Sequence, residues 1–178
     1  MKRILLVDDE PNLLQALRRT LVRAFPVADY RIELFDDPRQ ALERAVEVSF
    51  DVVISDFRMP PMSGVEFLKA FRELQPDCMR MILSASTDFD ALMSAVNEAE
   101  VLRYLVKPWS DEELVEVVRG ALARHDTLVE DRQLADEVRL SRGTVSAEEL
   151  ERRRLEAEEP GITRVKWGPG GSVILDDE

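Results

Sequence analysis

Four continuous runs of apolar residues recur along the chain, and each one ends in polar or charged residues. The runs begin at Ile4, Val52, Met79 and Leu102, whereas residues 30–35 alternate apolar and polar side chains. A short apolar run bounded by polar residues is typical of a strand buried on both faces, and alternation is typical of a half-exposed strand. The pattern predicts five strands, four of them fully buried and the one over residues 30–35 at an edge.

Helical patterns separate these strands. Each begins with a helix-start signal, either a proline at the first helical position or a capping residue. The signals are Pro11, Asp37-Pro38, Ser63 with Glu66, residues 87–90, and Ser110 with Glu113. Strands that alternate with helices predict βαβ units with right-handed crossovers, and therefore an α/β doubly wound parallel sheet with helices on both faces.

Polar side chains stand at the carboxyl ends of the predicted strands, where open α/β sheets bind their ligands. The acidic ones are Asp8, Asp9 and Asp56, and the fourth and fifth strands end at Ser84 and Lys107. Neighbouring carboxylates repel one another unless a cation lies between them, and oxygen ligands with open positions suit Mg²⁺. A metal, an ammonium group and a hydroxyl around a carboxylate nucleophile are what phosphoryl transfer to Asp56 requires.

Together with Ala85 after the hydroxyl, the aromatic Tyr104, and Pro108 after the lysine, these motifs resemble the receiver domain of bacterial two-component response regulators. The resemblance covers residues 1–125. It implies a CheY-like, flavodoxin-like (βα)5 fold with the strand order 2-1-3-4-5. The expected receiver domain therefore spans residues 1–125, and residues 126–178 form a separate tail.

The resemblance also implies a role for each residue at the phosphorylation site. Asp56 is expected to accept the phosphoryl group from a histidine kinase. Mg²⁺ is expected to bind Asp9, Asp56 and the backbone carbonyl of Arg58 directly, and Asp8 through water. Lys107 is expected to pair with the phosphoryl oxygens.

A second set of implied roles concerns the response to phosphorylation. Ser84 is expected to move and hydrogen-bond the phosphate, which lets Tyr104 turn inward and reshapes the face formed by the fourth helix, the fifth strand and the fifth helix. Arg58 and Ser86 occupy positions that tune the phosphoryl lifetime in this family. The Lys107-Pro108 peptide bond is expected to be cis, as in similar domains.

Composition narrows the class of partner. With 24 basic against 36 acidic residues, the chain is a poor candidate for binding the phosphate backbone of nucleic acid. The single cysteine, Cys78, excludes an internal disulfide and favours a reducing compartment. No apolar run reaches membrane-spanning length, and the amino-terminal run is too short for a signal peptide. We predict a cytoplasmic protein without nucleic-acid or membrane partners, in which Cys78 is inert and His125 lacks a partner cluster.

The tail is expected to begin with an extension of the last helix. Apolar residues between Leu128 and Val138 continue the helical pattern, and residues 141–143 break it. Ser146 with Glu149 predicts a charged helix, and two short apolar segments around residues 168–171 predict a small hairpin. No DNA-recognition helix, P-loop or histidine cluster is visible here. We interpret the tail as a protein–protein contact, with homodimerisation through it or through the switch face as one form of that contact.

These residues allow several functional interpretations. The chain is expected to be a signalling protein and not an enzyme, with a histidine kinase or a phosphotransfer protein as its partner. It could act as a terminal regulator or as a phosphorelay intermediate that passes the phosphoryl group to a histidine phosphotransfer protein. A Mg²⁺-dependent phosphatase usually needs an acid where Arg58 stands, and Arg58 does not release a proton at neutral pH. A flavodoxin-type cofactor site is disfavoured because the run Asp8-Asp9-Glu10 would repel a phosphate.

Overall fold

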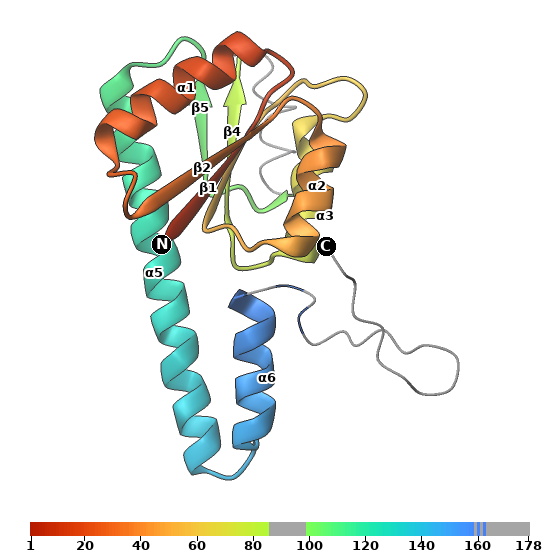
Figure 1. The fold of residues 1–178 in the computed structure, drawn as a ribbon, viewed down its shortest axis with the longest axis vertical. Helices are drawn as coiled ribbons and strands as arrows, with labels where there is room; N and C mark the ends of the chain where they lie inside the picture. Colours follow the sequence, from red (N-terminus) through yellow and green to blue (C-terminus); the bar gives the residue numbers. More distant parts are fainter. Residues whose placement is uncertain (86–98, 159, 161, 163–178) are drawn as a thin grey trace.

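A computed structural model of the chain describes residues 1–85, 99–158, 160 and 162. Its core is a five-stranded parallel sheet in the order β2-β1-β3-β4-β5, which confirms the predicted doubly wound α/β fold (Figure 1). The strands are β1 (Lys2–Val7), β2 (Tyr30–Phe35), β3 (Val52–Asp56), β4 (Met79–Ser84) and β5 (Arg103–Val106). The helix start predicted at residues 87–90, Ser86 and the hairpin predicted beyond Ile162 lie outside the described residues.

The described helices begin at the signals predicted for them. They are α1 (Pro11–Ala24), α2 (Pro38–Glu47), α3 (Gly64–Leu74), α5 (Asp111–Ser141) and α6 (Ala147–Glu158). Proline occupies the first turn of α1 and α2, where its missing N–H has no helical partner to lose. Ser63 and Glu66 form a reciprocal capping box before α3, and Ser110 caps α5 through the amide of Glu113.

Two apolar layers cover the two faces of the sheet. Helices α1 and α5 pack on one face, and α2 and α3 pack on the other. Successive residues of a strand point to opposite faces, so Ile4 and Leu6 face α1 and α5 whereas Leu5 and Val7 face α2 and α3. Because both faces are covered, β1, β3 and β4 read as continuous apolar runs.

The fifth strand departs from its predicted burial. We predicted a fully buried strand, but β5 lies at the second edge of the sheet and only Leu105 enters the core. Leu102, Tyr104 and Val106 keep 38%, 41% and 40% of their surface exposed. The prediction was wrong because hydrophobicity alone does not show whether a strand has one neighbour or two.

Helix α5 continues well beyond the sheet. Its first half packs on the sheet through Leu114, Val118, Ala121 and Leu122, and the rest projects from the body of the domain (Figure 1). Gly143, with a φ of 65°, ends the helix, and Ser146 starts α6 by accepting a hydrogen bond from the Glu149 amide. Helix α6 runs back toward the sheet, where Ser49 Oγ donates to the carbonyl oxygen of Ala157.

No helix within the described ranges is both long enough and apolar enough to cross a lipid bilayer.

Candidate functional site

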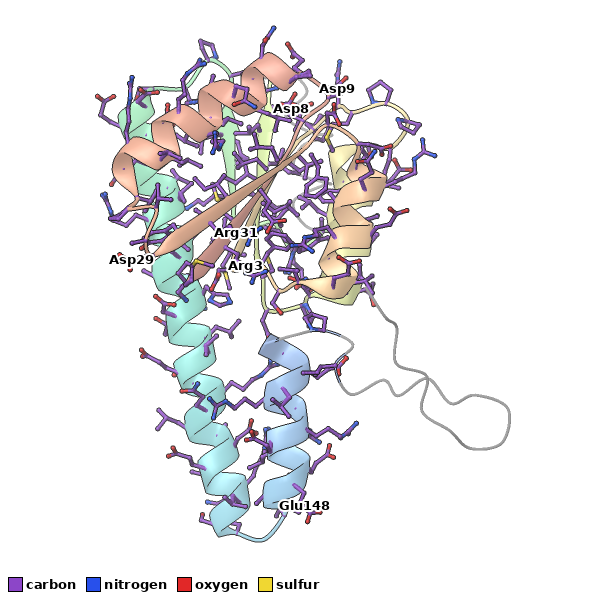
Figure 2. The ribbon with its side chains drawn as sticks, viewed as in Figure 1. Arg3, Asp8, Asp9, Asp29, Arg31 and Glu148 are labelled. Carbon is purple, nitrogen blue, oxygen red and sulfur yellow. The ribbon has the colours of Figure 1, made fainter. Side chains whose placement is uncertain are left out.

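The polar residues predicted at the strand ends meet at one edge of the sheet. Strand β3 lies between β1 and β4, with Val7 opposite Ser55 and Asp56 opposite Leu83, so Asp8, Asp56 and Ser84 emerge next to one another. Figure 2 shows Asp8 and Asp9 at the end of the sheet opposite to the end from which α5 projects. The amide of Lys107 donates to the Ser84 carbonyl oxygen at 2.8 Å, which ties the loop after β5 to the same edge.

Lys107 joins the two buried carboxylates. Its Nζ lies 3.1 Å from Asp8 Oδ2 and also forms an ion pair with Asp56 Oδ1. The side chain of Asp8 is fully buried and that of Asp56 is 10% exposed, whereas that of Lys107 is 18% exposed. The three groups therefore form a partly desolvated acid–base–acid cluster with one edge open to solvent.

Backbone amides hold the remaining carboxylate oxygens. The amide of Glu10 donates to Asp8 Oδ1 at 2.9 Å, and the amide of Arg58 donates to Asp56 Oδ2 at 2.7 Å. Each carboxylate thus has one oxygen on the backbone of its own loop and one on Lys107. The orientation of both side chains is set before any ligand arrives.

The electrostatics of the cluster follow from burial and charge. Burial raises the pKa of Asp8; the Glu10 amide and Lys107 oppose this, but the pKa stays above its usual value. Burial alone would lower the pKa of Lys107, yet hydrogen bonds and charge from Asp56 and Asp8 outweigh it and the pKa is raised. Lys107 is therefore protonated and positively charged at neutral pH.

Other predicted site residues lie around this cluster rather than in it. Asp9, Arg58 and Tyr104 are exposed, whereas Ser84 is buried at the end of β4. Ser86 lies outside the described residues. The Lys107-Pro108 peptide bond is cis, as predicted, and Pro60-Pro61 is a second cis bond.

Gly64 is a site residue that motif reading did not single out. A Cβ on Gly64 would lie 1.9 Å from the carbonyl oxygen of Asp56, so only glycine lets α3 start this close to the acceptor. Its amide also donates to the carbonyl oxygen of Phe57 at 3.0 Å. The Ser-Gly pair at a helix start after Asp56 was the only available signal for this contact.

His125 has charged neighbours that the sequence did not predict, although no described residues around it form a metal-binding group. His125 Nδ1 lies 3.3 Å from Asp51 Oδ1 and 3.9 Å from Asp126 Oδ1, and Lys2 forms ion pairs with both carboxylates. The cluster joins the amino-terminal end of the sheet to α5, far from Asp56 along each strand. Burial of Cys78 raises the pKa of its thiol well above the usual value, as expected for an unreactive cysteine.

The donor set of the strand-end cluster fits a hard cation. Carboxylate oxygens are the ligands that Mg²⁺ prefers, and a carboxylate oxygen can accept from more than one partner. Among the residues that the structure describes, no three Asp, Glu, His or Cys side chains are close enough together to hold a metal ion. The single positive charge of Lys107 offsets only one of the two carboxylate charges, and Asp9 would have to turn inward to complete a metal site.

A five-stranded parallel sheet with one lysine paired to two carboxylates at its carboxyl edge is the arrangement of a signal receiver domain. The sequence profile described as "Response regulator receiver domain" matches residues 4–119. The chain belongs to this family.

Relatives and solved structures agree with that assignment. The chain is 40% identical over 119 residues to the hydrogenase transcriptional regulatory protein HoxA of Cupriavidus necator, covering 67% of this chain and 24% of HoxA. It is 33% identical over 124 residues to the response regulator receiver protein CpdR of Brucella abortus, covering 68% of this chain and 98% of CpdR. The signal receiver domain of an HD domain-containing protein from Pseudomonas fluorescens Pf-5 superposes with a TM-score of 0.67 at 34% identity, covering 72% of this chain and 92% of that one.

The chain aligns with only part of most of these relatives, which limits the properties that can be inferred from them. The chain spans about a quarter of the length of HoxA and of the other transcriptional regulators that it resembles, whereas it spans nearly all of CpdR. Receiver domains of this family interact with histidine kinases or phosphotransfer proteins, and the family binds Mg²⁺ at its phosphorylation site. The match ends at residue 119, within α5, so the projecting part of α5 and the whole of α6 lie beyond it.

Proposed function

We propose that this chain is a response regulator of a two-component phosphorelay in which Asp56 accepts a phosphoryl group and a change at β5 carries the signal. The observation that carries the proposal is the contact of one ammonium group, Lys107, with both buried carboxylates at the carboxyl edge of the sheet. A structural ion pair needs one carboxylate. Two of them beside a buried hydroxyl form a site suited to phosphoryl transfer.

Asp56 is the side chain best placed to act as nucleophile. Its carboxylate is held by the Arg58 amide and by Lys107, and it is the more exposed of the two carboxylates in the cluster. An Oδ atom of Asp56 would attack the phosphorus atom of the kinase's phosphohistidine in line with its P–N bond. The O–P bond of an aspartyl phosphate forms as the P–N bond breaks, and the histidine leaves with the electron pair of that bond. Lys107 is placed to stay with the phosphoryl oxygens as they approach, which offsets their charge.

Asp9, Asp56 and the backbone carbonyl of Arg58 would hold Mg²⁺ directly, and Asp8 would hold it through water. The bound ion would neutralise phosphoryl oxygens during transfer. The chain's own contribution is to keep Asp8 immobile: it is fully buried and anchored by the Glu10 amide. Burial also raises the pKa of Asp8, which means that a cation beside it relieves an unfavourable buried charge.

The signal would leave through the exposed apolar edge at β5. Ser84 and Val106 are opposite each other in the β4–β5 ladder, and Tyr104 precedes Val106 by two residues on the same strand. Movement of Ser84 toward a phosphoryl group on Asp56 would open space for Tyr104, which is exposed. Its inward turn would change the surface offered to a protein partner. Arg58 and Ser86 are proposed to tune how long the phosphoryl group persists.

Phosphoryl incorporation tests this proposal. The full-length protein is incubated with acetyl phosphate and Mg²⁺, and its intact mass is followed with time. We expect one phosphoryl adduct in the wild type, none in Asp56→Asn, and none when the metal is chelated. Asp36→Asn is a matched control, because Asp36 is an exposed carboxylate just past the end of β2. An adduct that persists in Asp56→Asn at the wild-type rate contradicts the proposal.

A second measurement separates the modes of output. Beryllofluoride mimics the phosphoryl group on an aspartate, so the solution mass with Mg²⁺ is compared before and after its addition. A shift to a dimer favours a terminal regulator that signals by self-association. Binding without a change of mass favours a monomeric relay or a switch for a different protein, and the phosphorelay intermediate is then the better description.

A further inference from the structure

Ser55, which immediately precedes the acceptor, carries a buried hydroxyl that neither the phosphorylation chemistry nor the core uses. It is fully buried on β3, where it follows the apolar run Val52-Val53-Ile54 and directly precedes Asp56. A buried hydroxyl without a hydrogen bond is costly, and an apolar side chain would fill the same space. The Ser55 hydroxyl is satisfied by a single strong acceptor, the carbonyl oxygen of Asp56, at 2.9 Å.

That hydrogen bond fixes one end of the peptide between Asp56 and Phe57. The N–H at the other end of the same peptide donates to the carbonyl oxygen of Leu83 on β4 at 2.8 Å. The peptide plane is therefore held from both sides, by Ser55 through its oxygen and by β4 through its nitrogen. The Sδ atom of Met59 lies 4.0 Å from the Ser55 hydroxyl, but sulfur is the weaker acceptor and the carbonyl is nearer.

The orientation of this peptide determines where the next amide points. The Arg58 amide, one peptide further on, donates to Asp56 Oδ2 at 2.7 Å, so the Asp56 carboxylate is held by its own loop. With Oδ2 held there, Oδ1 faces Lys107. A rotation of the Asp56–Phe57 peptide would move the Arg58 amide and turn the carboxylate away from Lys107.

The start of α3 leaves this peptide little freedom. A Cβ on Gly64 would meet the Asp56 carbonyl oxygen at 1.9 Å and Ser55 Oγ at 3.0 Å, so helix, hydroxyl and carbonyl are in close contact. The glycine makes room for the carbonyl, and the serine supplies the hydrogen bond that keeps the carbonyl there.

We propose that Ser55 is a positioning residue for phosphoryl transfer, whose hydroxyl orients the Asp56 carboxylate through the Asp56–Phe57 peptide and the Arg58 amide. This role rests on the proposed function of Asp56. Reactions at a fixed nucleophile are sensitive to small displacements, since a misplacement of about 1 Å costs up to about a hundredfold in rate. Loss of one of several restraints is expected to cost about tenfold.

The test compares Ser55→Ala with Ile54→Val in the full-length protein. Ile54 is the neighbouring buried residue on β3, and its side chain packs on the opposite face of the sheet. Each change is expected to cost a small and similar amount of stability, Ser55→Ala by losing a hydrogen bond and Ile54→Val by losing a methylene group. The two variants are therefore expected to lose similar stability, but only Ser55→Ala removes the hydrogen bond that orients the Asp56–Phe57 peptide.

Two readouts are measured for each variant. The first is the rate constant of phosphorylation by acetyl phosphate with Mg²⁺, and the second is the hydrogen-exchange rate of the Arg58 amide without metal. We expect Ser55→Ala to phosphorylate about tenfold more slowly and to exchange the Arg58 amide faster, with Ile54→Val close to the wild type in both. Ser55→Cys, which keeps a weak donor, is expected to lie between them and replaces Ser55→Ala if that variant does not fold.

The outcomes separate this inference from the function on which it rests. Wild-type rates in Ser55→Ala, or equal slowing in Ser55→Ala and Ile54→Val, overturn the role of Ser55 while leaving Asp56 as the acceptor. A wild-type protein that takes up no phosphoryl group overturns the proposed function. The metal-free exchange of the Arg58 amide then still shows whether Ser55 holds the loop.

Discussion

Lys107→Gln removes the only ammonium group that contacts both Asp8 and Asp56 in the described part of the chain. The neutral amide keeps most of the length and polarity of the side chain. Two partly desolvated carboxylates then face each other without a cation between them. Their mutual repulsion and burial both act against the folded state.

The magnitude follows from how little solvent reaches the three groups. Breaking a buried ion pair by removing one partner costs about 3–5 kcal/mol. The Lys107 side chain is 18% exposed and that of Asp56 10%, so water screens part of the effect and the lower end of that range applies. We expect a loss of about 3 kcal/mol at pH 7.5, which lowers the midpoint of thermal unfolding by about 10 °C.

The stability lost in Lys107→Gln is also expected to depend on pH. Without Lys107 the pKa of Asp8, already raised by burial, rises further above its ordinary value of 3.8. A carboxyl group whose pKa is raised in the folded state destabilises the fold when it ionises. The loss of stability in Lys107→Gln is therefore greatest above that raised pKa and becomes smaller as the pH falls toward about 4. Millimolar Mg²⁺ is expected to restore part of the lost stability, because it supplies the missing positive charge.

The assay is urea unfolding of the metal-free protein at several pH values, followed by circular dichroism. Lys69→Gln on α3 is the matched control, since it makes the same chemical change outside the strand-end cluster. A Lys107→Gln variant as stable as the wild type at pH 7.5 without metal refutes the reasoning. So does a deficit that is independent of pH, because it would not come from the two carboxylates.

Two further predictions concern residues away from the acceptor. Gln75 is buried and its side chain serves three backbone groups, donating to the carbonyls of Ala45 and Val48 and accepting from the Phe50 amide. Gln75→Met leaves all three without that partner and is expected to cost about 3 kcal/mol in urea unfolding, while a loss below about 1 kcal/mol shows that water replaces the amide. Burial lowers the pKa of His125 below its ordinary 6.5, so protonation disfavours the fold and stability falls as the pH drops below about 6.5. His125→Gln is expected to flatten that part of the pH–stability profile, and identical profiles for the two proteins would contradict the assignment.

Much of the fold could be predicted because its causes are local in the sequence. Strands β1, β3 and β4 are covered on both faces, so each is a continuous apolar run, and the helices start at capping residues that lie beside them in the chain. The site could be predicted for a related reason. Parallel strands place their carboxyl ends along one edge, so a carboxylate, hydroxyl or lysine at each strand end is brought together by topology.

What could not be predicted depends on contacts between distant segments. The exposure of β5 depends on its place at the end of the strand order, which the family resemblance implies but the apolar pattern of its own residues does not. Arg80 reads as an ordinary charged residue in an apolar strand, yet its guanidinium is buried and donates to carbonyls of Pro76, Cys78 and Ala99. His125 meets Asp51 only because α5 crosses the amino-terminal end of the sheet.

The sequence also could not predict the contacts of individual atoms at the site. The hydrogen bond from the Ser55 hydroxyl to the Asp56 carbonyl oxygen depends on the backbone angles at the turn between β3 and α3. The need for glycine at position 64 depends on the same turn. Motif reading placed Asp9 among the metal ligands with Asp8 and Asp56, whereas the structure leaves its side chain exposed. The direct binding of a metal by Asp9 stays a prediction, and it requires a turn of that side chain.

The central claim is that Asp56, and no other carboxylate, receives the phosphoryl group. The most direct measurement is to phosphorylate the full-length protein with acetyl phosphate and Mg²⁺, reduce the acyl phosphate with borohydride, and locate the resulting homoserine by peptide mass spectrometry. We expect homoserine at position 56 alone, in a protein whose Asp8 and Asp9 are unmodified. Homoserine at another aspartate, or a protein left unmodified under conditions that phosphorylate a known receiver domain, would contradict it.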